Sequence, residues 1–133
     1  MRRLLLLALA LATGCGDGSG PAEPPIGTYV LTAISDAALP IRLPPTAGVT
    51  TFITGGSLDF SASGVVRYSL TTSTTGPSIP QPTVKTTTQD LAYTVSGSRL
   101  VFPRRALSGS FDSRTVVLRD EGPPRLTMRF VKP

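Results

Sequence analysis

Apolar and polar side chains alternate with a period of two along most of the chain after residue 26. This alternation is typical of β-strands that bury one face and expose the other. In the same region, no stretch of ten or more residues follows the helical period. The sequence therefore predicts an all-β domain. Eight strands are expected, at 28–34, 49–54, 57–60, 65–73, 86–96, 99–103, 115–119 and 125–131. A ninth, short strand at 41–43 is an alternative.

Two turn sequences set the pairing of neighbouring strands. Residues 95–100 read Val-Ser-Gly-Ser-Arg-Leu, which predicts a two-residue hairpin with Val95 opposite Leu100. A three-residue loop that ends at a left-handed Gly64 would place Phe60 opposite Val66. Each hairpin pairs two residues of the apolar set, so the turns and the alternation agree.

Short antiparallel strands joined by tight turns predict a single up-and-down meander of about eight strands. Closing this meander as a barrel would remove its exposed edges, and an open sheet or a sandwich is the alternative. Between residues 115 and 119 the inward side chains are either Val116 and Leu118 or Val117. An eight-stranded barrel can be filled by its own side chains or can hold one small ligand. The expected inward set is Tyr29, Leu31, Leu58, Phe60, Val66, Tyr68, Leu70, Leu91, Tyr93, Val95, Leu100, Phe102, Leu126, Met128 and Phe130.

Residues 71–88 differ in composition from the rest of the domain. Thr and Ser dominate this segment, three prolines interrupt it, and its only aliphatic side chains are Ile79 and Val84. A loop of this length inside a compact domain is uncommon unless it is functional or mobile. We expect its threonine-rich flanks to prolong two strands beyond the core and to leave a proline-rich tip at about residues 76–82.

The N-terminus has the features of an export signal. Two arginines precede an apolar run of nine Leu and Ala residues at positions 4–12. Such a run is too short to cross a hydrocarbon core as a helix, but it is typical of a signal peptide. We expect residues 1–14 to be removed, which leaves 119 residues and hence one domain of ordinary size. Residues 15–25, rich in Gly and Pro, predict a tether, and residues 26–133 predict the β-domain.

Residues 11–15, Leu-Ala-Thr-Gly-Cys, resemble the lipobox of bacterial lipoproteins. The match lies at Thr13, Gly14 and Cys15, while Ala12 stands where the family has a Leu-like residue. The resemblance implies that Cys15 receives a diacylglycerol, that cleavage precedes it, and that several acyl chains anchor the protein to a membrane. Gly16, in place of Asp, favours the outer membrane over the inner one, with the domain facing the periplasm or the exterior. The alternative is an ordinary secreted protein.

The β-domain begins Gly27-Thr28-Tyr29, and residues 93–102 follow the pattern Tyr-x-Val-x-Gly-x-x-Leu-x-Phe. In both motifs it resembles the lipocalin-like, calycin-type barrels of bacterial lipoproteins, and lipocalins carry Gly-x-Trp at the first. The first motif departs from the family pattern because Tyr replaces Trp. The resemblance covers about residues 26–132 and implies a β-barrel that binds small apolar ligands.

Residue types suited to catalysis are scarce in this sequence. The chain has no His, and its single Cys is the expected acylation site. A Ser-His or Cys-His couple is therefore absent from the sequence, as are imidazole metal ligands. The carboxylates are scattered, and we expect Asp59 and Asp90 to face outward. The sequence thus predicts a non-enzymatic protein without cofactor or metal.

Basic residues concentrate at the C-terminal end of the chain. The formal net charge is +5, or +3 without the two signal-peptide arginines, and residues 99–133 hold eight basic against three acidic side chains. We expect Arg125 and Arg129 on the outward face of the last strand, with Arg119 across from them. This basic surface could meet anionic lipid headgroups or wall polymer, or it could simply keep a strand face soluble. Nucleic acid is not an expected partner of an exported protein with few exposed aromatic residues.

Two functions fit these features. In the first, aromatic side chains inside the barrel hold a small apolar or amphipathic ligand, because a buried phenol requires a polar partner. In the second, the barrel is filled and acts as a structural or interaction module, contacting an envelope protein, wall polymer or anionic lipid through residues 71–88 or the basic C-terminal strands. The volume and lining of the barrel interior distinguish the two. The ligand-binding candidates are Tyr29, Tyr68, Tyr93, Phe102 and Phe130.

Overall fold

The computed structural model describes residues 23–123 and 125–133. The predicted signal peptide, the predicted acylation site Cys15 and the tether up to residue 22 lie outside this part of the chain. Within the described residues all regular secondary structure is β. The strands are β1 (Gly27–Ile34), β2 (Ala37–Ala38), β3 (Ile41–Arg42), β4 (Thr50–Phe60), β5 (Val65–Gly76), β6 (Ile79–Ala92), β7 (Thr94–Ser96), β8 (Arg99–Val101), β9 (Leu107–Phe111), β10 (Thr115–Asp120) and β11 (Leu126–Val131).

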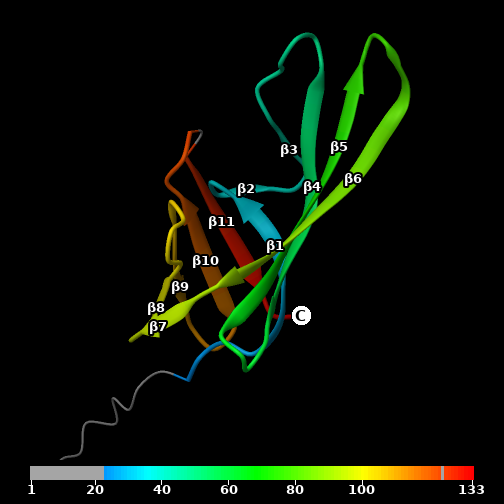
Figure 1. Ribbon diagram of the computed structural model, residues 1–133. Helices are drawn as coiled ribbons and strands as arrows, with labels where there is room; N and C mark the ends of the chain where they lie inside the picture. The colour runs from blue at the N-terminus through cyan, green and yellow to red at the C-terminus, as the bar shows by residue number, and fades with distance from the viewer. Residues whose placement is uncertain (1–22, 124) are drawn as a thin grey trace, which may run out of the picture.

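The strands form one antiparallel sheet that curls into a half-barrel (Figure 1). Its hydrogen-bonded order is β6-β5-β4-β1-β11-β10-β9-β8-β7, with β2 paired to β1 and β3 paired to β4. Around this order each strand lies beside its neighbour in sequence, and β1 pairs with β11. The exception falls between β6 and β7, which Tyr93 alone separates. The prediction of an all-β, up-and-down meander is confirmed.

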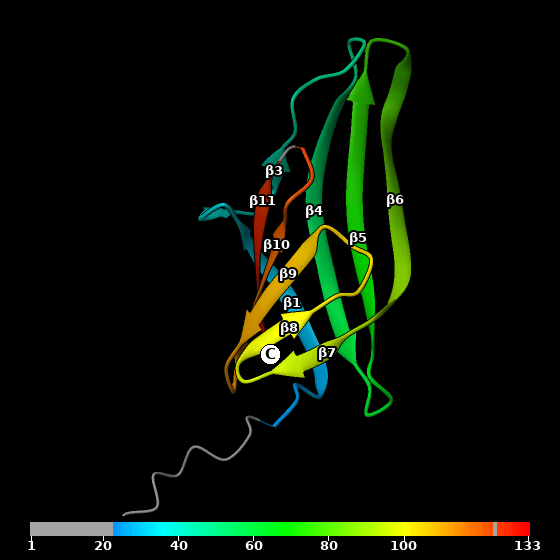
Figure 2. The ribbon, with the colours of Figure 1, turned by 60° about the vertical axis from the view of Figure 1, so that its left-hand side comes forward.

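The chain passes from one edge of the sheet to the other at Tyr93. β6 is paired with β5 and β7 is paired with β8, so the same extended stretch serves both edges in turn. Figure 2 shows β7 and β8 at the lower end, while β6 rises beside β5 and away from β8 and β9. The half-barrel is therefore open along the side that faces β6.

Strands β4, β5 and β6 continue beyond the half-barrel as an arm (Figures 1 and 2). Thr50 still pairs with Thr75 there, and β6 is fourteen residues long. The predicted lengthening of the two strands is confirmed, but the expected tip at 76–82 is wrong, since only Pro77 and Ser78 separate β5 from β6. Prolines within β6 are tolerated because it is an edge strand, where a missing N–H costs no ladder hydrogen bond.

Both predicted hairpin registers are confirmed. Val95 pairs with Leu100 across a turn in which Gly97 has φ of 60°. Phe60 pairs with Val66, and Gly64 has φ of 77°. Positive φ is accessible to glycine without a Cβ clash, so each turn can form where the sequence places it.

The expected inward side chains form the core. Eleven of the fifteen are buried, and the other four, Tyr68, Leu70, Val95 and Leu126, pack against the buried cluster. Val116 and Leu118 are fully buried, which settles the open register of β10. Ile34, Ile53 and Phe111 also belong to the core. In β1 the alternation would direct residue 33 inward after Leu31. A bulge between Leu31 and Ala33 shifts the alternation by one residue, so Ile34 points inward instead.

The expected strand boundaries are wrong at two places, and one strand was not expected. Segments 49–54 and 57–60 are one strand, β4, because Gly55 and Gly56 lie in a bulged strand rather than a turn. The expected strand 86–96 is longer and is interrupted at Tyr93, where the chain changes pairing partner. β9 was not expected, since Leu107–Phe111 carries only Ser and Gly between its two apolar ends.

The fit of β9 into the sheet generates a stability prediction. A Cβ on Gly109 would stand 2.8 Å from Leu118 Cδ2 and 3.2 Å from Leu100 Cβ. Because both leucines are fully buried, Gly109→Ala should lower the free energy of unfolding by about 1–3 kcal/mol, as overpacking does. Urea unfolding of the purified protein measures this loss.

Gly55→Ala is the matched control. The nearest atom to its added Cβ is Thr71 Cβ at 4.0 Å, so the free energy of unfolding should stay unchanged or rise slightly. Equal stability of the two alanine variants would contradict the close packing of β9 between β8 and β10.

Candidate ligand-binding site

A pocket of about 310 Å³ lies on the concave face of the half-barrel, at its open side. β5 and β6 form one wall, and β9, β10 and β11 form the other. The loop between β8 and β9 contributes Arg105 and Ala106, and it is held in place because Glu121 N donates to Ala106 O at 2.8 Å. The pocket is therefore framed by paired strands and a pinned loop.

The sheet register aims the lining side chains inward. Tyr68 pairs with Gln89 and Asp120 pairs with Leu107, and members of an antiparallel pair share a face. Leu118 and Asp120 lie two residues apart on β10, so both point to the concave side. The apolar part of the lining is Leu91, Leu107, Leu118 and Met128, and the polar part is Tyr68, Gln89, Arg105 and Asp120.

The Tyr68 phenol is the most strongly constrained polar group of the pocket. Its ring packs edge-on against Phe130 with 6.4 Å between the centroids, and its Oη donates to Met128 Sδ at 3.5 Å. Burial, and then the nearby Asp120 carboxylate, raise the pKa of Tyr68. The phenol is therefore neutral at physiological pH. A thioether is a weak hydrogen-bond acceptor, so the Tyr68 hydroxyl can donate instead to a stronger acceptor, such as an oxygen atom of a ligand.

Opposite charges lie at the rim of the pocket. One oxygen of Asp120 accepts a hydrogen bond from Gly122 N at 2.9 Å, and the exposed Arg105 stands on the facing loop. Among the residues that the structure describes, the only ion pair joins Arg67 to Asp90, at 3.0 Å. The pocket thus presents a phenol, an amide, a carboxylate and a guanidinium around an apolar floor.

The five predicted ligand-binding residues divide between two places. Tyr68 lines the pocket, with Phe130 packed behind it. Tyr29 and Tyr93 both contact Phe60 near the other end of the half-barrel, with centroid distances of 5.7 and 5.2 Å. Phe102 is buried in the core. The pocket therefore contains one of the predicted residues.

The two tyrosines away from the pocket serve the core. Tyr93 Oη donates to Ser61 O at 3.4 Å, and burial raises the pKa of Tyr93. The pKa of Tyr29 is also raised, first by burial and then by the charge of Asp112. Their phenols are thus neutral. The Tyr93 hydroxyl is bonded to the β4–β5 turn, and Tyr29 lines a separate hollow of about 380 Å³ with Phe111, Asp112 and Lys132.

The predicted outer-face residues have the following positions. Asp59 and Asp90 lie outward on either side of Arg67, as their register positions require. Arg119 and Arg129 share the outer face of β10 and β11, because Val117 pairs with Arg129 and Arg119 pairs with Thr127. Arg125 precedes β11 rather than lying within it.

The sequence pattern did not identify most of the polar lining. The pattern places Gln89 in the expected strand 86–96 without a role, Asp120 in a turn, and Arg105 in no element. The missing signal was the alternation of Leu107, Gly109 and Phe111, in which a glycine occupies the middle inward position. Recognising that strand would have placed Leu107 beside Asp120 on the inner face of the sheet.

In residues 23–123 and 125–133, no three side chains among His, Cys, Asp and Glu lie close enough together to hold a metal ion. Nor do those residues contain a helix long and apolar enough to cross a membrane.

The environment of Tyr68 predicts a pH dependence. Its folded pKa is raised above the value of about 10 for a free tyrosine, so the folded state holds the phenolic proton more tightly than the unfolded chain. The associated stability is fully present below about pH 10 and is lost as the pH rises through the folded pKa. Phenolate absorbance, compared between the protein and Tyr68→Phe, follows this group.

Asp120→Asn should lower the pKa of Tyr68 but leave it above its usual value, because burial is the larger cause and remains. Asp59→Asn, on the outer face, should leave the titration of Tyr68 unchanged. A Tyr68 titration that responds equally to both substitutions would contradict the placement of Asp120 beside the phenol.

Neither a protein-family model, nor a curated protein, nor a solved structure matches this chain. The resemblance to lipoproteins and to lipocalin-like barrels thus stays a prediction from the sequence.

Proposed function

We propose that this protein is a lipid-anchored protein of the bacterial cell envelope that binds a small amphipathic molecule at the open side of its half-barrel. The observation that carries the proposal is the pocket beside Tyr68, with its apolar floor and polar rim. Ligand sites in proteins are mostly apolar concavities with a few convergent polar groups.

The size of the pocket limits the ligand. Its volume of about 310 Å³ lies at the low end of the range for small-molecule sites, roughly 300–1,000 Å³. The floor of Leu91, Leu107, Leu118 and Met128 can cover a short hydrocarbon or ring system. A longer chain would have to extend out along the side facing β6.

The polar rim sets the chemistry of the ligand's head. The neutral Tyr68 hydroxyl can donate to a carbonyl, ether or hydroxyl oxygen, and Asp120 can accept from a hydroxyl or amine. Asp120 also disfavours an anionic head beside Tyr68, since like charges repel at short range. The ligand class that fits best is a neutral or cationic amphipathic molecule with a hydrogen-bonding head.

The expected lipid anchor places the pocket in a suitable environment. The described chain begins at the end of the half-barrel where β1 starts and β11 ends (Figure 1). Asp120 and Met128 lie toward the opposite end, since Met128 pairs with Ile34 at the end of β1. A domain anchored through Cys15 would hold its pocket away from its own attachment point and open to the envelope.

A second candidate function is contact with an envelope protein through the arm. Almost every side chain of β6 is exposed, and Val84 is 66% exposed. The outer edge of β6 lacks a neighbouring strand within the described sheet, and such edges can pair with an added strand. The prolines of β6 weaken this reading, because they remove donors from part of that edge.

Blocking the pocket tests the first function. Ala106→Trp places a bulky side chain at the rim without changing a core residue, and it should weaken binding of the neutral amphipathic fluorophore phenylnaphthylamine by roughly tenfold or more. Fluorescence titration measures the dissociation constant. Ala62→Trp, in the exposed β4–β5 turn, should bind as the unaltered protein does.

Equal affinity in both tryptophan variants would count against the pocket. If binding were then lost on deleting residues 77–82, the arm would be the site.

The anchor is tested separately at Cys15. Cells grown with labelled palmitate should incorporate the label into the protein, and the protein should fractionate with membranes. Cys15→Ser should abolish labelling and release the protein from the membrane fraction, because the acyl chains supply the membrane affinity. Continued labelling of Cys15→Ser would overturn the proposed anchor.

A further inference from the structure

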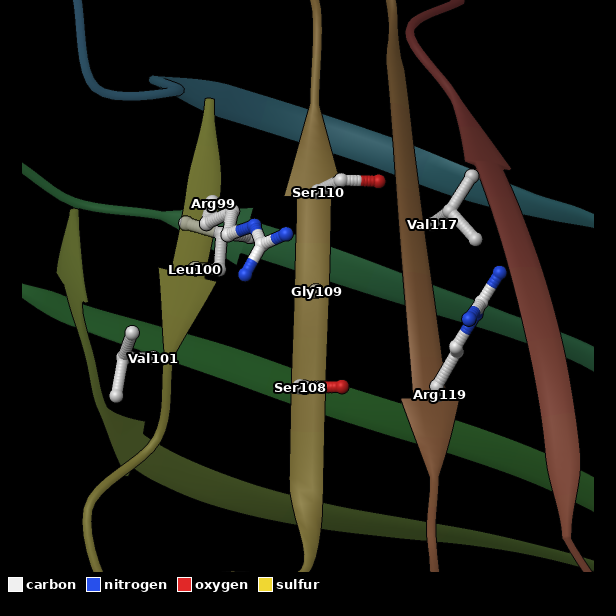
Figure 3. A pocket seen from close by; sticks show the side chains of 8 residues that line it. All are labelled: Arg99, Leu100, Val101, Ser108, Gly109, Ser110, Val117 and Arg119. Carbon is white, nitrogen blue, oxygen red and sulfur yellow. The ribbon is translucent and has the colours of Figure 1, made fainter. Parts of the chain in front are cut away.

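A second concavity lies on the outer face of the sheet, over β8, β9 and β10. Its volume is about 440 Å³, and it is separate from the pocket at Tyr68, which shares only β9 and β10 with it and uses their concave face. Figure 3 shows Arg99 on β8 and Arg119 on β10 on opposite sides of β9, with Ser108 and Ser110 between them.

The sequence of β9 explains the hollow. On the outer face β9 carries only the hydroxymethyl groups of Ser108 and Ser110, whereas the flanking strands carry Arg and Val. On the inner face Gly109 leaves its space to Leu100 and Leu118. The outward side chains of β9 are therefore shorter than those of β8 and β10, and these two strands form the walls of a groove.

The strand register places two arginines at diagonal corners of this groove. One cross-strand row is Arg99, Ser110 and Val117, and the next is Val101, Ser108 and Arg119. With strands about 4.8 Å apart and residues about 3.3 Å apart along each strand, the two arginine Cα atoms are roughly 12 Å apart. In Figure 3 the Arg99 side chain extends toward β9, and the Arg119 side chain extends from β10 on the side away from β9, toward Val117 and β11. The two guanidinium groups thus lie on either side of β9 and β10.

The charge in the groove is not neutralised within the described chain. Arg99 and Arg119 are exposed, and neither makes an ion pair with a residue that the structure describes. Arg129 extends the positive charge, since it lies next to Val117 on β11. The pKa of the Asp112 carboxylate is lowered, first by hydrogen bonds from Arg114 N and Thr115 N at 2.8 and 2.7 Å and then, to a smaller extent, by the positive charge of Arg129.

We propose that this groove binds a phosphoryl group. Guanidinium groups donate in a planar fork that matches a phosphate oxyanion, and approach from two sides suits a tetrahedral anion with several acceptor oxygens. Ser108 and Ser110 add hydroxyl donors from below. Val101 and Val117 give the groove an apolar wall on each side, which can contact a carbon substituent of the phosphate.

Two soluble probes distinguish the source of the phosphoryl group. Inorganic phosphate represents a free phosphate, and glycerophosphoglycerol represents the phosphodiester headgroup of an anionic lipid. Each is titrated into the full-length protein while the backbone amide resonances of Ser108, Ser110 and Val117 are followed by NMR. We expect saturable shifts of these amides with at least one probe.

Substitutions test whether the arginines are responsible. The double variant Arg99→Gln, Arg119→Gln should weaken binding at least tenfold, and Arg119→Lys should cause a smaller loss because charge remains without the fork. Arg42→Gln, which removes one positive charge from the exposed β3, should bind as the unaltered protein does. The amide spectrum of each variant reports whether the fold is retained.

Binding of inorganic phosphate with this pattern supports the proposal with a free phosphate as ligand, and binding of the diester alone supports it with a lipid headgroup as ligand. Absence of saturable binding of both probes would overturn the proposal. Equal weakening by Arg42→Gln and by the double variant would also overturn it, since binding would then follow net charge rather than the groove.

Discussion

The pairing of β1 with β11 is the constraint on which the rest of the structure depends. Leu31 lies opposite Phe130 and Ile34 lies opposite Met128, so the two ends of the described domain are joined by backbone hydrogen bonds and by buried side chains. When the first and last strands of a meander are paired, the barrel can be open only where two strands that are consecutive in sequence fail to pair. In this chain the opening falls between β6 and β7.

The opening has a simple physical cause. The stretch from Ile79 to Ser96 is long and extended, but its first part pairs only with β5 and its second part only with β8. β6 follows β4 and β5 into the arm, and cross-strand hydroxyl pairs such as Thr71 with Thr86 at 3.0 Å continue toward it. The side of the half-barrel facing β6 is left unpaired, and the pocket beside Tyr68 occupies that side.

Much of the fold could be predicted from the sequence, because one-sided burial imposes a strict period of two. The hairpins at Gly64 and Gly97 and the inward set followed from that period and from turn chemistry. Two kinds of feature escaped it. Bulges at residues 32 and 54 change which residues point inward without changing the composition of the strand. In β9 the middle inward position is Gly109, so the strand lacks the apolar alternation that would identify it.

The candidate sites were harder to predict than the fold. Tyr68 was an expected ligand-binding residue, but its partners Arg105, Leu107 and Asp120 come from a loop, an unrecognised strand and the end of β10. Proximity of this kind depends on how the sheet curls, which a pattern along the chain does not specify. The same holds for the outer groove, where Arg119 was expected to contribute to a basic surface but Arg99 was not.

β9 links the two sites, because its small residues shape both faces of the sheet. Gly109 allows Leu100 and Leu118 to fill the interior beside the pocket, and the serines on either side of it lower the outer surface between two arginines. One face would accept a neutral or cationic amphipathic molecule and the other a phosphoryl group. The two chemistries are separated by the thickness of a single sheet.

The most direct test of the central claim is a map of backbone amide shifts on adding phenylnaphthylamine to the protein. Binding at the open side of the half-barrel predicts that the largest shifts cluster at Tyr68, Gln89, Ala106, Leu107 and Asp120. Shifts confined to the arm or to the outer groove, or absence of saturable shifts, would contradict the assignment of the ligand site to the half-barrel.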